Sequence, residues 1–190
     1  MIEVFDDVIT EEEQDLIYKE LISSHFPWYI PANGLATTTF SEDTDKRDKN
    51  IFEDNHFVHT FMWEGSWTGT NPAHREIVTY TFSRLLNHLK LSKGELCRAK
   101  VNIQNKTYKK GKYNTPHVDG FGDHYVALYY ACDSDGDTHI FETTEYPWKI
   151  KKTISPKKGR FVVFDGKYYH AGCHPRKNNV RIVINYNFLK

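Results

Sequence analysis

The chain has 190 residues, of which 39% are hydrophobic and 15% aromatic, and its 25 Lys and Arg balance 25 Asp and Glu. This length predicts one domain, residues 1–190, and this aromatic content argues against a disordered chain. Because the formal net charge is zero, no overall basic field draws the molecule to nucleic acid or to an anionic membrane.

The cysteines and the hydropathy pattern bear on the compartment. Cys97, Cys132 and Cys173 are odd in number and far apart, which argues against a disulfide framework and against a Cys-x-x-Cys motif. No basic region precedes a long apolar stretch at the start, and no segment approaches the roughly 20 apolar residues of a membrane span. We therefore expect a soluble protein of a reducing compartment, the cytoplasm, with no membrane partner.

The N-terminal part, residues 1–95, predicts one short strand and two helices. The strand is Ile2–Phe5. Thr10–Glu13 has the pattern of a capping box, and apolar residues at helical spacing follow it to about Ser23. A second helix is predicted to begin at Asn71-Pro72 and to end at Gly94.

Between the two helices, residues 27–69 predict a long irregular segment. Long irregular segments in compact domains are often lids or binding loops. The aromatic side chains of this segment, among them Trp28, Tyr29 and Trp63, are therefore candidates for the wall of a substrate groove.

The C-terminal part, residues 96–190, changes to short strands separated by Gly, Pro, Asp and Lys turns. This pattern predicts a β-sandwich or barrel, and the two helices would pack on one of its faces, which makes the fold class α+β. The expected strands are Arg98–Gln104, Tyr125–Ala131, His139–Phe141, Lys149–Ile154, Arg160–Phe164, Tyr168–His170 and Asn179–Phe188.

A His-x-Asp motif, His117 and Asp119, is the main candidate for chemistry. In an extended segment, residues two apart point the same way, so both side chains can reach one ion. His170 and His174 are candidates for a third ligand. We favour His170, because a hairpin after the apolar strand 160–164 would bring it beside His117, whereas His174 lies in a predicted loop. Two imidazoles and one carboxylate leave three metal positions open, as in non-haem Fe(II) oxygenases.

Arg181 lies in the strand that follows His170. A fixed guanidinium there suits the distal carboxylate of a dicarboxylate co-substrate. The same dicarboxylate could fill two of the open metal positions and O2 the third.

Four segments carry a family resemblance. Tyr108–Gly111 and Pro116–Asp119 together resemble the Tyr-x-x-Gly…His-x-Asp segment of prolyl-4-hydroxylase-like Fe(II)/2-oxoglutarate dioxygenases. Gly136–Phe141 is similar to the family's Gly-Gly-x-Thr-x-Phe turn, and Gly159–Phe164 to the strand before the distal histidine. The resemblance covers about residues 98–188, and the N-terminal half is similar to phage-encoded members of the superfamily.

The resemblance implies a double-stranded β-helix, or jelly roll, for residues 96–190, with Fe(II) as the metal and 2-oxoglutarate and O2 as co-substrates. If the chain is phage-encoded, it would act in the host cytoplasm. The implied ligands of Fe(II) are His117, Asp119 and His170, and the implied contacts of 2-oxoglutarate are Arg181, Tyr108, Thr138 and Asn102.

These residues predict an oxygenase that hydroxylates an unactivated C–H bond and releases succinate and CO2, with peptidyl proline as the substrate that the resemblance suggests. The substrate class is a peptide, a protein or a small molecule, and the sequence gives no oligomeric state. A nucleic-acid-demethylating oxygenase of the same superfamily is the alternative that zero net charge disfavours. A metal-binding, cupin-like jelly roll without turnover is the alternative that Arg181, Thr138 and Tyr108 disfavour.

Overall fold

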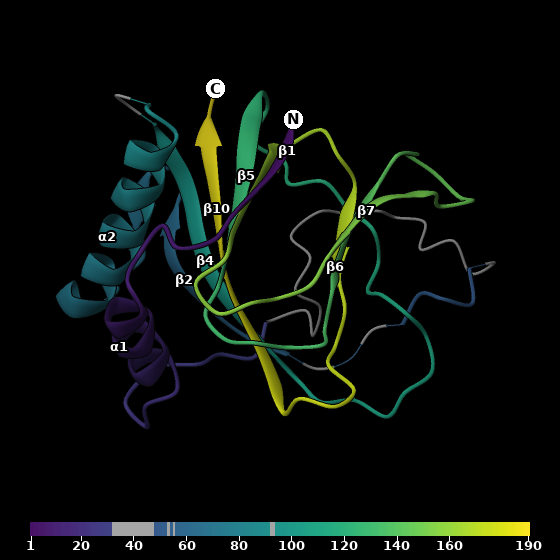
Figure 1. The fold of residues 1–190 in the computed structure, drawn as a ribbon, viewed down its shortest axis with the longest axis horizontal. Coiled ribbons are helices and arrows are strands. Elements are labelled where there is room, and N and C mark those ends of the chain that lie inside the picture. The colour runs from purple at the N-terminus through teal and green to yellow at the C-terminus, as the bar shows by residue number, and fades with distance from the viewer. Residues whose placement is uncertain (32–47, 53, 55, 92–93) are drawn as a thin grey trace.

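The fold consists of two antiparallel β-sheets that face each other, with two helices on the outer side of the larger sheet (Figure 1). The computed structural model describes residues 1–31, 48–52, 54, 56–91 and 94–190. The arrangement is a jelly roll and confirms the predicted fold class. The larger sheet runs in the order β1 (Ile2–Phe5), β8 (Phe161–Asp165), β5 (His124–Tyr130), β10 (Val180–Leu189), β4 (Leu96–Asn105), β2 (His56–Trp63) and β3 (Ser66–Trp67), and the smaller in the order β7 (Ile150–Ile154), β6 (Thr138–Phe141) and β9 (His170–Gly172).

Helix α1 (Glu11–Leu21) begins at the predicted capping box. The Thr10 hydroxyl accepts from the Glu13 N–H at 3.3 Å, and the Thr10 N–H donates to the Glu13 carboxylate at 2.8 Å. Two backbone donors at the start of the helix are thereby satisfied, which fixes where the chain enters α1.

Helix α2 (Pro72–His88) begins as predicted, because the Asn71 side chain accepts from the Ala73 N–H at 2.8 Å. It ends before the expected Gly94, since Lys90 takes a φ of 56°, in the left-handed region that stops a helix. No helix in the described residues is long and apolar enough to cross a membrane.

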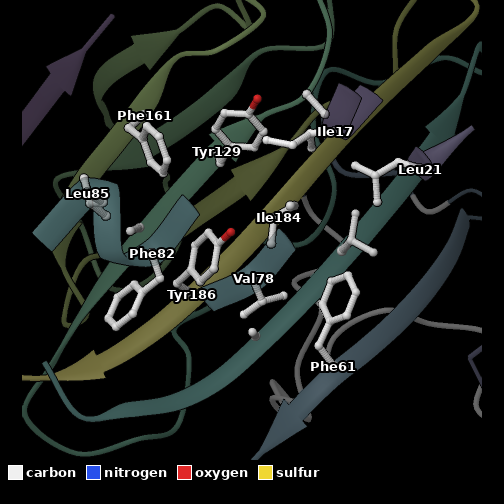
Figure 2. Packing of buried hydrophobic residues seen from close by; sticks show 14 of the residues in the cluster. Ile17, Leu21, Phe61, Val78, Phe82, Leu85, Tyr129, Phe161, Ile184 and Tyr186 are labelled. Carbon is white, nitrogen blue, oxygen red and sulfur yellow. The ribbon is translucent and has the colours of Figure 1, made fainter. Parts of the chain in front are cut away.

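Side chains along β4 and β10 alternate between two very different surroundings. On the outer face, apolar residues of both strands pack under the helices (Figure 2). Tyr186 of β10 stacks on Phe82 of α2 with ring centroids 5.7 Å apart, and its hydroxyl lies 2.5 Å from the Thr81 hydroxyl. The apolar half of each strand thus holds the helices in place.

The inner face of the same two strands is polar and points toward the smaller sheet. Near β5 and β8 the space between the sheets is filled by apolar residues, including Leu128, Ile140 and Phe164. Near β4 and β10 it is lined by buried or half-buried polar side chains, which form one continuous surface. These are Arg98, Lys100, Asn102 and Gln104 of β4 and Arg181, Asn185 and Asn187 of β10.

The prediction of an irregular segment over residues 27–69 is wrong for its second half. Strand β2 pairs with β4 along its length, and β3 closes a hairpin with β2. The local sequence lacks a strict alternation, so the pairing with β4 decides the conformation there. Residues 32–47, on which much of the predicted lid falls, lie outside the described residues.

Strand β9 begins at His170, two residues later than predicted. The Tyr168 N–H donates to the Asp165 carbonyl at 3.0 Å and closes a turn, so the chain becomes extended only at His170.

Truncation of a helix residue under the sheet should be costly. Leu85 of α2 is fully buried in the outer core. We expect Leu85→Ala to lower the free energy of unfolding by about 2–5 kcal/mol, because it leaves a cavity. Leu16 of α1 is 67% exposed, and Leu16→Ala should cost about 0.5 kcal/mol or less. Urea denaturation of both variants measures the difference, and equal losses would contradict this packing.

Candidate metal centre and co-substrate pocket

The two candidate histidine ligands are held together by their own backbones. The His117 N–H donates to the His170 carbonyl at 3.0 Å, and the His170 N–H donates to the His117 carbonyl at 2.9 Å. Asp119 follows in the same segment, and the candidate ligand atoms of the three residues lie within 4.8 Å of one another. The structure therefore brings His170, and not His174, to the motif. The predicted hairpin is wrong, because the chain crosses from β8 in the larger sheet to β9 in the smaller sheet.

Each histidine has a backbone acceptor for its second nitrogen. The His117 Nδ1 lies 3.1 Å from the Thr115 carbonyl oxygen, and the His170 Nδ1 lies 3.2 Å from that of Tyr168. A carbonyl can only accept, so Nδ1 carries the proton and Nε2 keeps the lone pair that a metal needs.

Burial lowers the pKa of both imidazoles, that of His117 to about 4, with the second imidazole adding to the effect at His117. Both rings are therefore neutral at pH 7, which is the form that binds metal.

Asp119 is buried and held at both of its oxygens. The Arg98 guanidinium lies 2.7 Å from Oδ1, and the Asn187 amide donates to Oδ2 at 2.8 Å. Burial alone would raise the pKa of Asp119, but Arg98 and the two imidazoles hold it well below its usual range. The carboxylate is thus ionised and fixed in orientation.

The donor set fits Fe(II). Ligand bonds of about 2 Å around one ion put neighbouring donor atoms roughly 3–4 Å apart, close to the 4.8 Å limit within which these atoms lie. Two nitrogens and one oxygen on one side of the ion leave the other side for co-substrates.

Arg181 is buried in the same pocket as the triad and is held by three acceptors. Its Nε donates to the Gly136 carbonyl at 2.7 Å, its Nη1 to Gln104 Oε1 at 2.6 Å, and its Nη2 to Thr138 Oγ1 at 2.7 Å. Each terminal nitrogen keeps a second N–H for a ligand. Gly136 must lack a side chain, since a Cβ there would lie 2.5 Å from the Cys173 carbonyl oxygen.

Thr138 and Asn102 also line the pocket. The Tyr130 hydroxyl donates to Thr138 Oγ1 at 2.6 Å and Arg181 donates to the same atom, so the Thr138 proton is left for another acceptor. The Asn102 side-chain oxygen is buried and has no hydrogen-bond partner among the described residues. Both side chains are therefore available to a polar ligand between Arg181 and the triad.

Comparisons with known proteins agree with this geometry. Residues 103–189 match the model of the 2OG-Fe(II) oxygenase superfamily. The matched segment is 87 of the 190 residues and includes His117, Asp119, His170 and Arg181. The name of this superfamily agrees with Fe(II) as the predicted metal and with 2-oxoglutarate and O2 as the predicted co-substrates, and the three candidate ligands lie together as such a site requires. A comparison with curated proteins found no significant match.

Solved structures share the fold of this chain. An oxidoreductase of the 2OG-Fe(II) oxygenase family from Burkholderia pseudomallei aligns with a TM-score of 0.67 at 11% identity over 99% of this chain and 85% of that chain. Viral collagen prolyl hydroxylase from Paramecium Bursaria Chlorella virus-1, in a 2OG complex, aligns with a TM-score of 0.53 at 21% identity over 98% and 94%. A prolyl hydroxylase from Trichoplax adhaerens, in complex with a hypoxia inducible factor peptide, aligns with a TM-score of 0.62 at 12% identity over 99% and 83%.

Tyr108 is the predicted co-substrate contact that the structure does not bring to the pocket. It is 87% exposed, in the loop after β4, where the Lys106 ammonium lies 5.5 Å from its ring. The strand ends at Asn105, so the chain leaves the sheet before Tyr108 and carries this side chain outward. Similarly, Trp28, Tyr29 and Trp63 do not line the pocket, and Trp28 instead packs on the outer core.

Several residues that line the pocket were not predicted. The signal for those on β4 was the alternation of polar residues with Ala99, Val101 and Ile103, which marks a strand with one polar face. His56 gave no signal, because its strand was not predicted. The residues concerned are His56, Arg98, Lys100, Gln104, Asn114 and Asn185.

The lowered pKa of His117 predicts how stability depends on pH. In the metal-free protein the folded state takes up the His117 proton only near pH 4, whereas the unfolded chain does so near 6.5. Stability from this residue is therefore present above pH 6.5 and lost as the pH falls toward 4, by at most about 3 kcal/mol. We expect His117→Gln to flatten the slope of unfolding free energy against pH in this window. The matched control is His25→Gln, which removes one imidazole from an exposed position. A wild-type slope in the His117 variant would refute the assignment.

Proposed function

We propose that this protein is an Fe(II)- and 2-oxoglutarate-dependent oxygenase that hydroxylates an unactivated C–H bond, with peptidyl proline as its substrate. The observation that carries the reaction type is the position of the His117–Asp119–His170 triad and Arg181 in one pocket. The substrate is suggested by the two similar structures that are prolyl hydroxylases, one of them in complex with a peptide.

When bound together, Fe(II), 2-oxoglutarate and O2 supply an oxidative decarboxylation that releases succinate and CO2 and oxidises the substrate. In this proposal the chain holds the ion through His117 Nε2, His170 Nε2 and one oxygen of Asp119. Arg98 and Asn187 keep the Asp119 carboxylate from rotating, so it would hold the ion together with the two histidines in a fixed arrangement.

At the other end of the pocket, Arg181 would bind the distal carboxylate through its two remaining terminal N–H groups. The Thr138 hydroxyl, which receives two hydrogen bonds from the protein, would donate its own proton to the same carboxylate. A guanidinium in fixed orientation recognises a carboxylate by two parallel hydrogen bonds. A metal-binding jelly roll without turnover would not require this carboxylate-binding pair of Arg181 and Thr138.

An aromatic pair near the metal end is our candidate for substrate contact. Trp63 lies opposite Arg98 in the β2–β4 ladder, so its side chain is on the inner face. Its ring contacts Phe121 at 5.6 Å, and Phe121 covers the Arg98 guanidinium at 5.1 Å. Because aromatic faces pack well against apolar rings, this pair suits a proline side chain beside the triad.

The co-substrate assignment is tested by anaerobic titration of the Fe(II)-loaded protein with 2-oxoglutarate. We expect the visible charge-transfer band of the chelate in wild type and none in His117→Ala. Arg181→Lys keeps the charge but loses the planar fork, and should weaken 2-oxoglutarate binding by about tenfold or more. Tyr108→Phe is the matched control and should bind as wild type. Iron binding without any band in wild type would remove the basis of the proposal.

The substrate assignment needs a separate assay. With proline-containing peptides we expect succinate to form in proportion to a gain of one oxygen atom on the peptide, read by mass spectrometry. The same peptides with alanine in place of proline should leave only slow, uncoupled succinate formation. Trp63→Ala should raise the KM for peptide without changing that uncoupled rate. Equal turnover of both peptide sets would exclude proline as the target.

A further inference from the structure

A groove runs between the two helices, on the face of the larger sheet opposite to the triad pocket (Figure 1). The Tyr80 hydroxyl donates to the Glu13 carboxylate near one end of α1, and His74 Nε2 lies 3.0 Å from the Glu20 carboxylate near the other end. Because the residue numbers fall along α2 while they rise along α1, the two helices are antiparallel. The groove between them has a volume of about 410 Å³, within the range of ligand-binding clefts.

The lining of the groove is mainly apolar and has helical spacing. Helix α1 contributes Leu16 and Ile17, and α2 contributes Ala73, Ile77 and the ring of Tyr80. Leu16 lies at the edge with 67% of its surface exposed, so the groove is open to solvent. An apolar strip between two antiparallel helices suits a third helix, whose side chains at i, i+3, i+4 and i+7 would enter it.

The surface around the groove is acidic. Residues 1–31 contain eight Asp or Glu residues and one Lys, although the whole chain has a formal net charge of zero. Some of these acids form ion pairs with basic side chains of residues 157–160. At the groove itself, Glu13 and Glu76 belong to the lining, and Glu12 is exposed in the first turn of α1. A helix with basic residues beside its apolar side chains would therefore be attracted to this face.

We propose that the groove between α1 and α2 binds an amphipathic helix of a partner protein, with Lys and Arg on both sides of its apolar stripe. The acidic surface disfavours a second copy of this chain, because pairing two such faces would bring like charges together. It disfavours nucleic acid and an anionic membrane for the same reason. Since the triad pocket lies on the opposite face of the larger sheet, the partner would bind whether or not the proposed function is correct.

Three synthetic peptides of about 18 residues, or five helical turns, separate apolar from electrostatic binding. The first has Leu at i, i+3, i+4 and i+7 and Lys on both sides of this stripe. The second has Ala in place of each Leu, and the third has Glu in place of each Lys. We expect the Leu/Lys peptide to bind the full chain, and the other two to bind at least about tenfold more weakly, by fluorescence anisotropy at about 0.15 M salt.

Variants of the chain locate the binding site. Leu16→Gln removes an apolar side chain without adding charge, and should weaken Leu/Lys peptide binding by about fivefold or more. Ile150→Gln is the matched control, since Ile150 is 42% exposed on β7, and it should bind as wild type does. Glu76→Lys should weaken the Leu/Lys peptide by about tenfold or more and strengthen binding of the Leu/Glu peptide. Glu145→Lys makes the same charge change at an exposed position after β6 and should do neither.

Hydrogen exchange tests the same site without substitutions. Bound Leu/Lys peptide should slow the exchange of backbone amides in α1 and α2, because it opposes local opening of the two helices, and should leave β6 and β7 unchanged. Thermal melts of the four variants should match wild type, since each substituted side chain is exposed.

Three results would overturn the inference. Wild-type affinity of both Leu16→Gln and Glu76→Lys for the Leu/Lys peptide would reduce the binding to a general attraction between basic peptide and acidic surface. No binding of this peptide at about 1 mM would mean that the groove holds no such helix. A wild-type dimer that dissociates in Leu16→Gln and that the peptide does not displace would show that a second copy covers the groove.

Discussion

The alternation of side chains along β4 and β10 is the constraint on which the rest of the structure depends. One face of these strands is apolar and is covered by α1 and α2, and the other carries cations and amides toward the smaller sheet. Because the side-chain period of a strand is two residues, a slip of one residue in the β4–β10 register would put Arg98 and Lys100 under the helices. The apolar packing under the helices and the polar metal site on the opposite face therefore both require the same β4–β10 register.

The ion pair between Arg98 and Asp119 connects the larger sheet to the segment that pairs with the smaller sheet. Arg98 belongs to the large sheet, whereas Asp119 belongs to the segment that pairs with β9 of the small sheet through His117 and His170. A buried pair of this kind gains little net stability over an apolar pair of the same size, but losing one partner leaves an uncompensated charge. Its contribution is geometric, since it fixes the carboxylate relative to both histidines.

The sequence predicts the helices and strands that have a signal in their own residues. It does not predict those whose conformation depends on pairing with a distant strand. The capping box, the helix start at Asn71 and the strands after Gly94 each carry a signal within a few residues, and the structure has them near the predicted positions. Strand β2 has no such signal, because its conformation depends on pairing with β4. His56 was missed for the same reason, since it lies in β2. Tyr108 shows the reverse case, where a matching motif spacing did not predict that the chain leaves the sheet at Asn105.

The direction in which the Thr138 hydroxyl donates its proton determines which ligand groups the Arg181 end of the pocket prefers. Two donors, the Tyr130 hydroxyl and Arg181, already fill the acceptor capacity of the Thr138 oxygen, so that hydroxyl can only donate toward a ligand. Arg181 likewise offers only donors. An acid that ended in a primary amide would bring N–H groups of its own against these donors. The pocket therefore discriminates a carboxylate from an amide of nearly the same shape by mismatched hydrogen-bond polarity, and not by size.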